Sequence, residues 1–199
     1  MSTPGVNPLV PAAIPPFTGS GVLPPYVGAD PAQIAGASPY ETTLSELIVR
    51  FGTSRERKDI LRGFLAHRQA LLGLGIYGVQ WLDGSFVENI EFTQGRSPND
   101  IDVVTFFVRP PNLVDQRKYE AFVASNMAVF SPFAAKAQFK TDPYFVDVSL
   151  GPLFVIDQAT YWSGLFSHQR VTSLRKGLVK VWLDPQRDDA NALQLLDEV

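Results

Sequence analysis

Three aspartates with strand-like spacing are the residues in this chain that point most directly to chemistry. Asp100 and Asp102 are separated by one residue in the apolar segment 100–108, and Asp147 lies in a later apolar segment, 144–150. Because side chains alternate between the two faces of a strand, Asp100 and Asp102 are expected to share one face. If the two strands pair, facing side chains lie about 4.5–5.5 Å apart, and the three carboxylates converge.

Three converging carboxylates require a cation, because like charges raise one another's pKa. Mg²⁺, or Mn²⁺ in its place, prefers oxygen ligands and would remove the conflict. Two such ions about 3.5–4 Å apart would stabilise the attacking and leaving oxygens of a phosphoryl displacement. An isolated Asp-x-Asp is more often a water-exposed strand edge, but two acids on one side of so apolar a strand favour a metal or a cleft.

A Gly-Ser pair follows the predicted strand 76–82 and is a candidate phosphate site. Gly84 permits close approach of the backbone to a phosphate. The Ser85 hydroxyl, with the free N–H groups of the turn 86–89, could bind an anion. Alone, Gly-Ser is an ordinary turn. Its place in the chain favours phosphate binding, because a strand precedes it and a short helix, the Asp-x-Asp strand and a later strand with a third Asp follow it.

Lys176 lies in the one basic cluster after the third predicted strand, together with Arg170 and Arg175. We predict that Lys176 contacts a triphosphate or an acceptor, the alternative being a solvated loop.

The order of periodic segments predicts an α+β (mixed α/β) domain with helices packed on a small mixed sheet. Thr43 followed by Glu46 is a capping-box signature for a helix that ends near Gly52. A second helix follows, with Arg57 and Arg68 expected on its solvated face. The later elements are predicted as strands 76–82, 100–108, 144–150 and 177–183 and helices 112–130, 158–166 and 189–196.

Nine of the 16 prolines lie in the first 40 residues. Because proline lacks an N–H and fixes φ, residues 1–40 are predicted to form an extended, partly ordered arm before a single domain at 41–199. The arm could pack on the domain, a protein partner or a second copy of the chain. Its candidate apolar anchors are Phe17, Val22, Leu23, Tyr26 and Val27.

The composition excludes several classes of protein. The chain has 199 residues, 45% hydrophobic residues, no cysteine and a formal net charge of −3. This charge does not favour a grip on long nucleic acid, and the lack of cysteine excludes disulfides, zinc-thiolate sites and Cys nucleophiles. With no signal-peptide pattern and no apolar run of about 18 residues, we expect a cytoplasmic protein without a membrane segment.

Together, these motifs resemble the nucleotidyltransferase superfamily of DNA polymerase beta. The segments LDGSFVEN, PNDIDVVTFF and YFVDVSL, with the later YWSGLFSHQR, are similar to an uncharacterised bacterial group of small stand-alone nucleotidyltransferase-like proteins. The upstream LPP and TLSELIVRFGTSRERKDIL segments also resemble that group, and the resemblance extends over most of residues 20–183.

The resemblance implies roles for individual residues in a nucleotidyltransferase-like palm. Gly84 and Ser85 would hold the β- and γ-phosphates of a nucleoside triphosphate, and Asp100 and Asp102 would bind the catalytic metal pair. Asp147 would complete one metal site and help activate the attacking hydroxyl.

One departure from the family pattern is the slightly longer segment 86–99. We expect its additional residues to form a loop at the mouth of the site, from which Arg96 reaches a phosphate.

The function implied is an Mg²⁺-dependent transfer of a nucleoside monophosphate from a nucleoside triphosphate, ATP among the candidates, to an unidentified acceptor. A small molecule, a protein side chain or a short RNA end would suit the acidic chain. The alternative is a non-catalytic nucleotidyltransferase-fold module that binds a nucleotide or a toxin-like protein, in the manner of an antitoxin.

Overall fold

A five-stranded mixed sheet forms the centre of the protein, in a computed structural model that describes residues 14–187 and 189–199. The strand order is β1-β5-β2-β3-β4. β2 runs antiparallel to β3 and β5, whereas the β3–β4 and β1–β5 pairs are parallel. The strands are β1 (Tyr40–Glu41), β2 (Tyr77–Asp83), β3 (Ile101–Val108), β4 (Thr141–Asp147) and β5 (Val179–Leu183).

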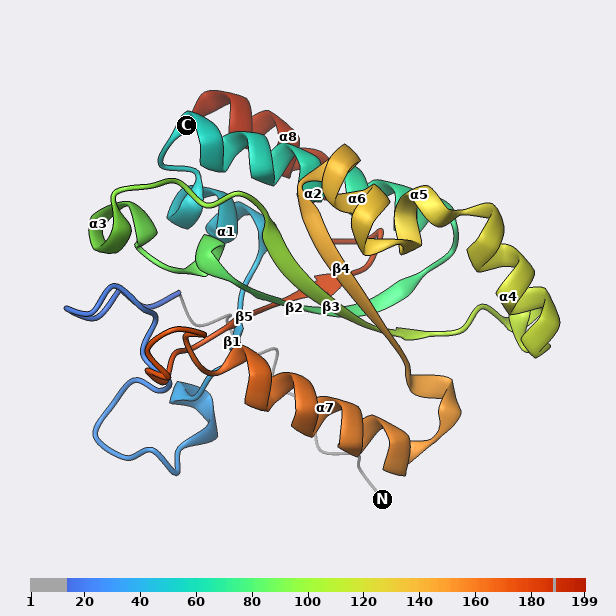
Figure 1. Cartoon of the computed structure of the whole chain (residues 1–199), viewed down its shortest axis with the longest axis horizontal. Helices are drawn as coiled ribbons and strands as arrows, with labels where there is room; N and C mark the ends of the chain where they lie inside the picture. Colours follow the sequence, from blue (N-terminus) through green and yellow to red (C-terminus); the bar gives the residue numbers. More distant parts are fainter. Residues whose placement is uncertain (1–13, 188) are drawn as a thin grey trace, which may run out of the picture.

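Helices cover both faces of this sheet, so the predicted mixed α/β class is confirmed. In Figure 1, α7 lies alone on one face, and α1, α2, α6 and α8 lie on the other. The helices are α1 (Leu44–Phe51), α2 (Arg55–Gly73), α3 (Ile90–Gln94), α4 (Gln116–Ser125), α5 (Met127–Phe130), α6 (Pro132–Phe139), α7 (Pro152–Phe166) and α8 (Asp189–Glu198). Short 3₁₀ turns are η1 (Ile34–Gly36), η2 (Ser85–Val87), η3 (Pro111–Leu113) and η4 (Val148–Leu150).

The capping box predicted for α1 is present. The Thr43 side chain accepts a hydrogen bond from the Glu46 N–H, and the Glu46 side chain accepts one from the Thr43 N–H. Each bond satisfies a backbone donor that the first helical turn leaves without a partner. The N-cap residue of α2 is Ser54, whose hydroxyl accepts from Arg57 N.

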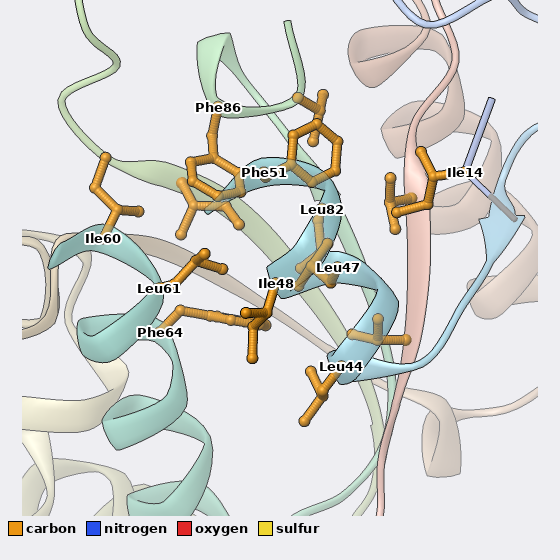
Figure 2. Close-up of a cluster of buried hydrophobic side chains, with 14 of the residues drawn as sticks. Ile14, Leu44, Leu47, Ile48, Phe51, Ile60, Leu61, Phe64, Leu82 and Phe86 are labelled. Atoms are coloured by element: carbon orange, nitrogen blue, oxygen red, sulfur yellow. The ribbon is translucent and has the colours of Figure 1, made fainter. Parts of the chain in front are cut away.

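The apolar stripes of α1 and α2 meet over the sheet in the largest core cluster. Figure 2 shows Phe51 of α1 beside Phe86, which enters the core from η2. The two ring centroids are 5.4 Å apart, and both side chains are almost fully buried. Since Phe86 directly follows Ser85, the core fixes the position of the Gly84–Ser85 turn.

Arg57 and Arg68 are buried, which corrects the expectation that both lie on a solvated face of α2. Arg68 donates to the side-chain oxygen of Gln80 at 2.6 Å and to the carbonyl of Trp182 at 2.7 Å. α2 lies between the sheet and α8 and also contacts α6, so several sides of this helix are covered. A guanidinium group satisfies its donors there by reaching carbonyl and amide oxygens.

Two element boundaries differ from the predicted ones near the later carboxylates. β4 begins at Thr141 and includes Pro143, which an edge strand tolerates because the missing N–H can face away from its neighbour. The predicted helix 112–130 is divided into α4 and α5 at Asn126, and α6 follows before β4.

The arm, from residue 14 onward, packs against the domain. Ile14, Leu23 and Tyr40 are part of the largest core cluster, whereas Tyr26 and Val27 are about 40% exposed and are not anchors. The prolines at positions 4, 8 and 11 lie outside the described residues.

No helix in the described ranges is long and apolar enough to cross a membrane.

Candidate functional site

Strand register brings three aspartates into one row at one end of the sheet. Asp102 on β3 is paired with Asp83 on β2 and with Asp142 on β4. Directly paired residues point to the same face, and neighbouring strands lie about 4.8 Å apart. Asp100 precedes β3 directly, and its charge acts on Asp102. This end of the sheet therefore gathers four carboxyl groups.

Asp147 lies elsewhere, so the prediction that it converges with Asp100 and Asp102 is wrong. The parallel register pairs Asp147 with Phe107, five residues beyond Asp102 and about 17 Å along the strand. An odd separation also turns the Asp147 side chain to the opposite face. The carboxylate on β4 that adjoins Asp102 is Asp142.

Asp147 is part of a buried ion pair with Arg109. The Nε and Nη2 atoms of Arg109 lie 2.7 and 2.6 Å from Asp147 Oδ2. The guanidinium group also stacks on the Tyr119 ring, 4.1 Å from its centroid, and donates to Gln116 Oε1. These contacts join the ends of β3 and β4 to α4, which gives Asp147 a structural role.

Asp102 is the member of the row without a direct partner. Its carboxylate makes no ion pair or hydrogen bond with the residues that the structure describes. Burial, followed by the charges of Asp100 and Asp142, raises the pKa of Asp102 to about 6. The Asp102 carboxylate thus has no cation in direct contact, although the charges of Lys176 and Lys136 partly oppose the rise in its pKa.

The adjacent glycine lets Asp102 approach the Gly-Ser turn. Gly84 has a φ of 80°, in the left-handed region, and a Cβ atom built there would lie 1.9 Å from Asp102 Oδ2. Any larger residue would displace the carboxylate or the turn. The Ser85 hydroxyl makes no hydrogen bond with another described residue, which leaves it available to a ligand.

Lys176 is buried beneath this turn, which corrects the prediction that it contacts phosphate. Its ammonium group lies 3.0 Å from Asp83 Oδ1 and 2.6 Å from Glu88 Oε1, and it donates to the Gly84 carbonyl at 3.3 Å. The ammonium thus forms ion pairs with both carboxylates and donates hydrogen bonds to Glu88 and to the Gly84 carbonyl. Lys176 therefore holds the turn in place.

Burial governs the protonation of this ion cluster. It raises the pKa of Asp83 to about 7, although the Lys176 ammonium opposes the shift. For Lys176, burial lowers the pKa, but the charges of Asp83 and Glu88 outweigh it and the net shift is upward. The lysine stays charged, and its carboxylate partners stabilise it.

Arg57 fixes the same turn from the α2 side. Its Nη1 donates to the Phe86 carbonyl at 2.7 Å, and its Nη2 donates to the Glu88 carbonyl at 2.6 Å. An ion pair of 2.6 Å with Glu91 holds the guanidinium group. Two buried cations thus anchor the segment that follows Gly84.

Arg96 is exposed in the loop after α3. It donates to Gln94 Oε1 at 3.0 Å and to the Ser97 carbonyl at 3.2 Å, so its described bonds stay within its own loop. A contact between Arg96 and a phosphate stays a prediction.

Lys136 of α6 is the residue of the site that the sequence did not suggest. Its ammonium group contacts Asp100 Oδ2 and lies 3.7 Å from Asp142 Oδ2. Neither Lys136 nor Asp142 belongs to a recognisable motif. In the sequence, the one feature that could have indicated Asp142 is its even spacing from Tyr144 and Val146, which places all three on the same face of a strand.

Asp102 forms, with its neighbours Asp100 and Asp142, a donor set that fits a hard divalent cation. Asp100, Asp102 and Asp142 offer only carboxylate oxygens, the ligands that Mg²⁺ and Mn²⁺ prefer. Asp102 has no cation in direct contact, and its carboxylate lies against Gly84, the residue before Ser85. Among the described residues, no group of three Asp, Glu, His or Cys side chains is already arranged to hold a metal ion.

Residues 15–182 match the model of DUF6932, a family of unknown function. The chain belongs to this family. No curated protein and no solved structure matches the chain. Membership of DUF6932 assigns no activity, so any functional argument rests on the geometry at the ends of β2, β3 and β4.

Asp102→Asn is expected to stabilise the metal-free protein at pH 8. Since the pKa of Asp102 is raised from 3.8 to about 6, its ionised form opposes folding above pH 6, and the penalty disappears when both states are protonated, below about pH 4. The free energy of unfolding should rise by about 1–3 kcal/mol at pH 8 and hardly change near pH 4. Urea unfolding in EDTA measures this, with Asp157→Asn on the exposed side of α7 as control. Equal stability of Asp102→Asn and wild type at pH 8 would contradict the electrostatics described.

Lys176→Met is expected to lower the free energy of unfolding by about 3–5 kcal/mol, because Asp83 and Glu88 would stay buried without their cation. Lys180→Met is the matched control. Lys180 pairs with Glu41 but is 28% exposed, so its loss should cost less than about 1 kcal/mol. Equilibrium urea unfolding compares the two variants. Similar losses for both would mean that the Lys176 cluster does not hold the turn.

Proposed function

We propose that this DUF6932 protein is a divalent-metal-dependent nucleotidyltransferase that moves a nucleoside monophosphate from a nucleoside triphosphate to an acceptor hydroxyl. One observation carries the proposal: Asp102, directly beside the Gly84–Ser85 turn, is the register partner of Asp142 on the adjacent parallel strand. Carboxylates next to a free hydroxyl and a tight glycine turn suit a metal-bound triphosphate.

Asp100, Asp102 and Asp142 would hold the metal through their carboxylate oxygens, with Asp142 in the role that the sequence suggested for Asp147. A bound Mg²⁺ supplies positive charge where negative charge develops on the phosphoryl oxygens. The rigid attachment of Asp102 to the centre of the sheet sets the position of this charge, and positioning with electrostatics accounts for most catalysis of phosphoryl transfer.

The Gly84–Ser85 turn would bind the β- and γ-phosphates. The Ser85 hydroxyl would donate to one of the phosphate oxygens, and Gly84, which has no side chain, leaves room for the Asp102 carboxylate beside them. Lys176 and Arg57 act indirectly, because they fix this turn from below and from the side. A rigid phosphate site keeps the α-phosphorus at a constant distance from Asp102.

The reaction forms a bond between the acceptor oxygen and the α-phosphorus and breaks the bond to the bridging oxygen of the β-phosphate. Pyrophosphate leaves with that bond's electron pair. A carboxylate oxygen of Asp142 accepts the proton of the acceptor hydroxyl. The net charge of −3 supports a small molecule, a protein side chain or a short RNA end as acceptor.

Nucleotide binding tests this proposal. With Mg²⁺ and a nucleoside triphosphate at about 100 times its dissociation constant, the wild type should gain about 2.7 kcal/mol, which raises the melting temperature by about 5–10 °C. Asp142→Asn should abolish the rise, because a metal ligand is lost. Asp147→Asn should start from a lower melting temperature and keep the rise, and Asp157→Asn should behave as wild type.

Transfer of label from an α-phosphate-labelled nucleotide onto candidate acceptors then tests the reaction itself. A magnesium-dependent rise without label transfer would favour the non-catalytic binding module. The absence of any rise with all four nucleotides, or its loss in Asp147→Asn but not in Asp142→Asn, would overturn the proposal.

A further inference from the structure

Lys136 stands where a cation between two of the carboxylates would stand. The lysine projects from α6, which packs against β4, and its ammonium group touches Asp100 and lies 3.7 Å from Asp142 Oδ2. The Lys136 side chain is 51% exposed, whereas those of Asp100 and Asp142 are 14% and 18% exposed. The lysine therefore has more room to move than the carboxylates.

A metal ion and this ammonium group would compete for the same oxygens. Both are cations, and both would bind the Oδ2 atoms of Asp100 and Asp142. Charge repulsion and lack of room therefore prevent the two from binding there together. Lys176, the other lysine near the row, is 3% exposed and fully engaged, so it has no freedom to leave. Only one of the two lysines can respond to a metal.

We propose that Lys136 is a displaceable counter-ion, which neutralises Asp100 and Asp142 until the metal enters and then binds a phosphate of the nucleotide. This inference rests on the proposed function. The Lys136 ammonium is tethered to α6 by a flexible four-carbon stem, so it stays within reach of the site after it leaves the carboxylates. The phosphate oxygens are then the nearest new negative charge. Metal loading thereby prepares nucleotide binding.

The proposal makes Lys136 a positioning residue with two effects of opposite sign. Lys136→Met removes the competitor, so metal binding becomes tighter. The same change removes a phosphate contact, so nucleotide binding to the metal-saturated protein becomes weaker. A purely structural lysine would weaken both steps or neither.

Mn²⁺ binding, measured from the electron paramagnetic resonance signal of free Mn²⁺, tests the first effect. Lys136→Met should lower the dissociation constant for Mn²⁺ by about two- to fivefold, the size expected for loss of a half-exposed ion pair. Lys136→Arg keeps the charge and should not bind Mn²⁺ more tightly than wild type. Lys118→Met on α4, which belongs to none of the described ion pairs, controls for the change in net charge and should leave the dissociation constant unchanged.

The second effect is measured at saturating Mn²⁺ with a non-hydrolysable nucleoside triphosphate. Lys136→Met should raise the nucleotide dissociation constant by about three- to tenfold, and Lys136→Arg should restore most of the affinity. Circular dichroism and melting temperature confirm that the variants are folded.

The outcomes separate this inference from the proposed function. Equal Mn²⁺ affinity of wild type and Lys136→Met, with metal and nucleotide bound by both, overturns the role of Lys136 and leaves the proposed function intact. Tighter Mn²⁺ binding with unchanged nucleotide affinity overturns the phosphate contact. No saturable Mn²⁺ binding in either protein overturns both proposals.

Discussion

The register of β2, β3 and β4 places three carboxyl groups in one row, and the need to balance their charge organises the surrounding structure. Lys176 neutralises the buried Asp83 end of the row, and Lys136 neutralises the Asp142 end. Asp102, in the middle, has no cation in direct contact, and its pKa is raised because burial and its neighbours disfavour the charged form. A fold that needed only stability would gain from an uncharged residue there, so the unpaired aspartate is the strongest sign of a binding function.

The two lysines divide the site into a fixed half and an adaptable half. On the fixed side, Phe86 is packed in the core against Phe51 (Figure 2). Arg57 and Lys176 bind carbonyls of the turn between β2 and α3. On the other side, half-exposed Lys136 faces carboxylates that a ligand can reach. Rigid placement of one set of groups and mobility of another is the usual requirement for a site that must both position a substrate and admit it.

The elements that local chemistry dictates were predictable from the sequence. The capping box at Thr43 and the apolar stripes of the first helices each depend on a few neighbouring residues, and each is present. The identity of the third carboxylate was not predictable in this way, because it depends on the register of two strands about 40 residues apart. Pro143 suggested a strand entry, whereas the edge position of β4 lets the strand begin earlier, and this moves Asp142, not Asp147, beside Asp102.

The roles of the basic residues depended on tertiary structure in the same way. Lys176 and Arg57 are of residue types that usually lie in solvent, yet both are buried against carbonyls and carboxylates that are distant in sequence.

The most direct test of the central claim is the anomalous scattering of Mn²⁺ in crystals grown with Mn²⁺ and a non-hydrolysable nucleoside triphosphate. The account predicts a peak within coordination distance of Asp102 and Asp142 oxygens, with the triphosphate beside Ser85. A metal bound elsewhere, with the Asp102 and Asp142 carboxylates free of it, would contradict the account.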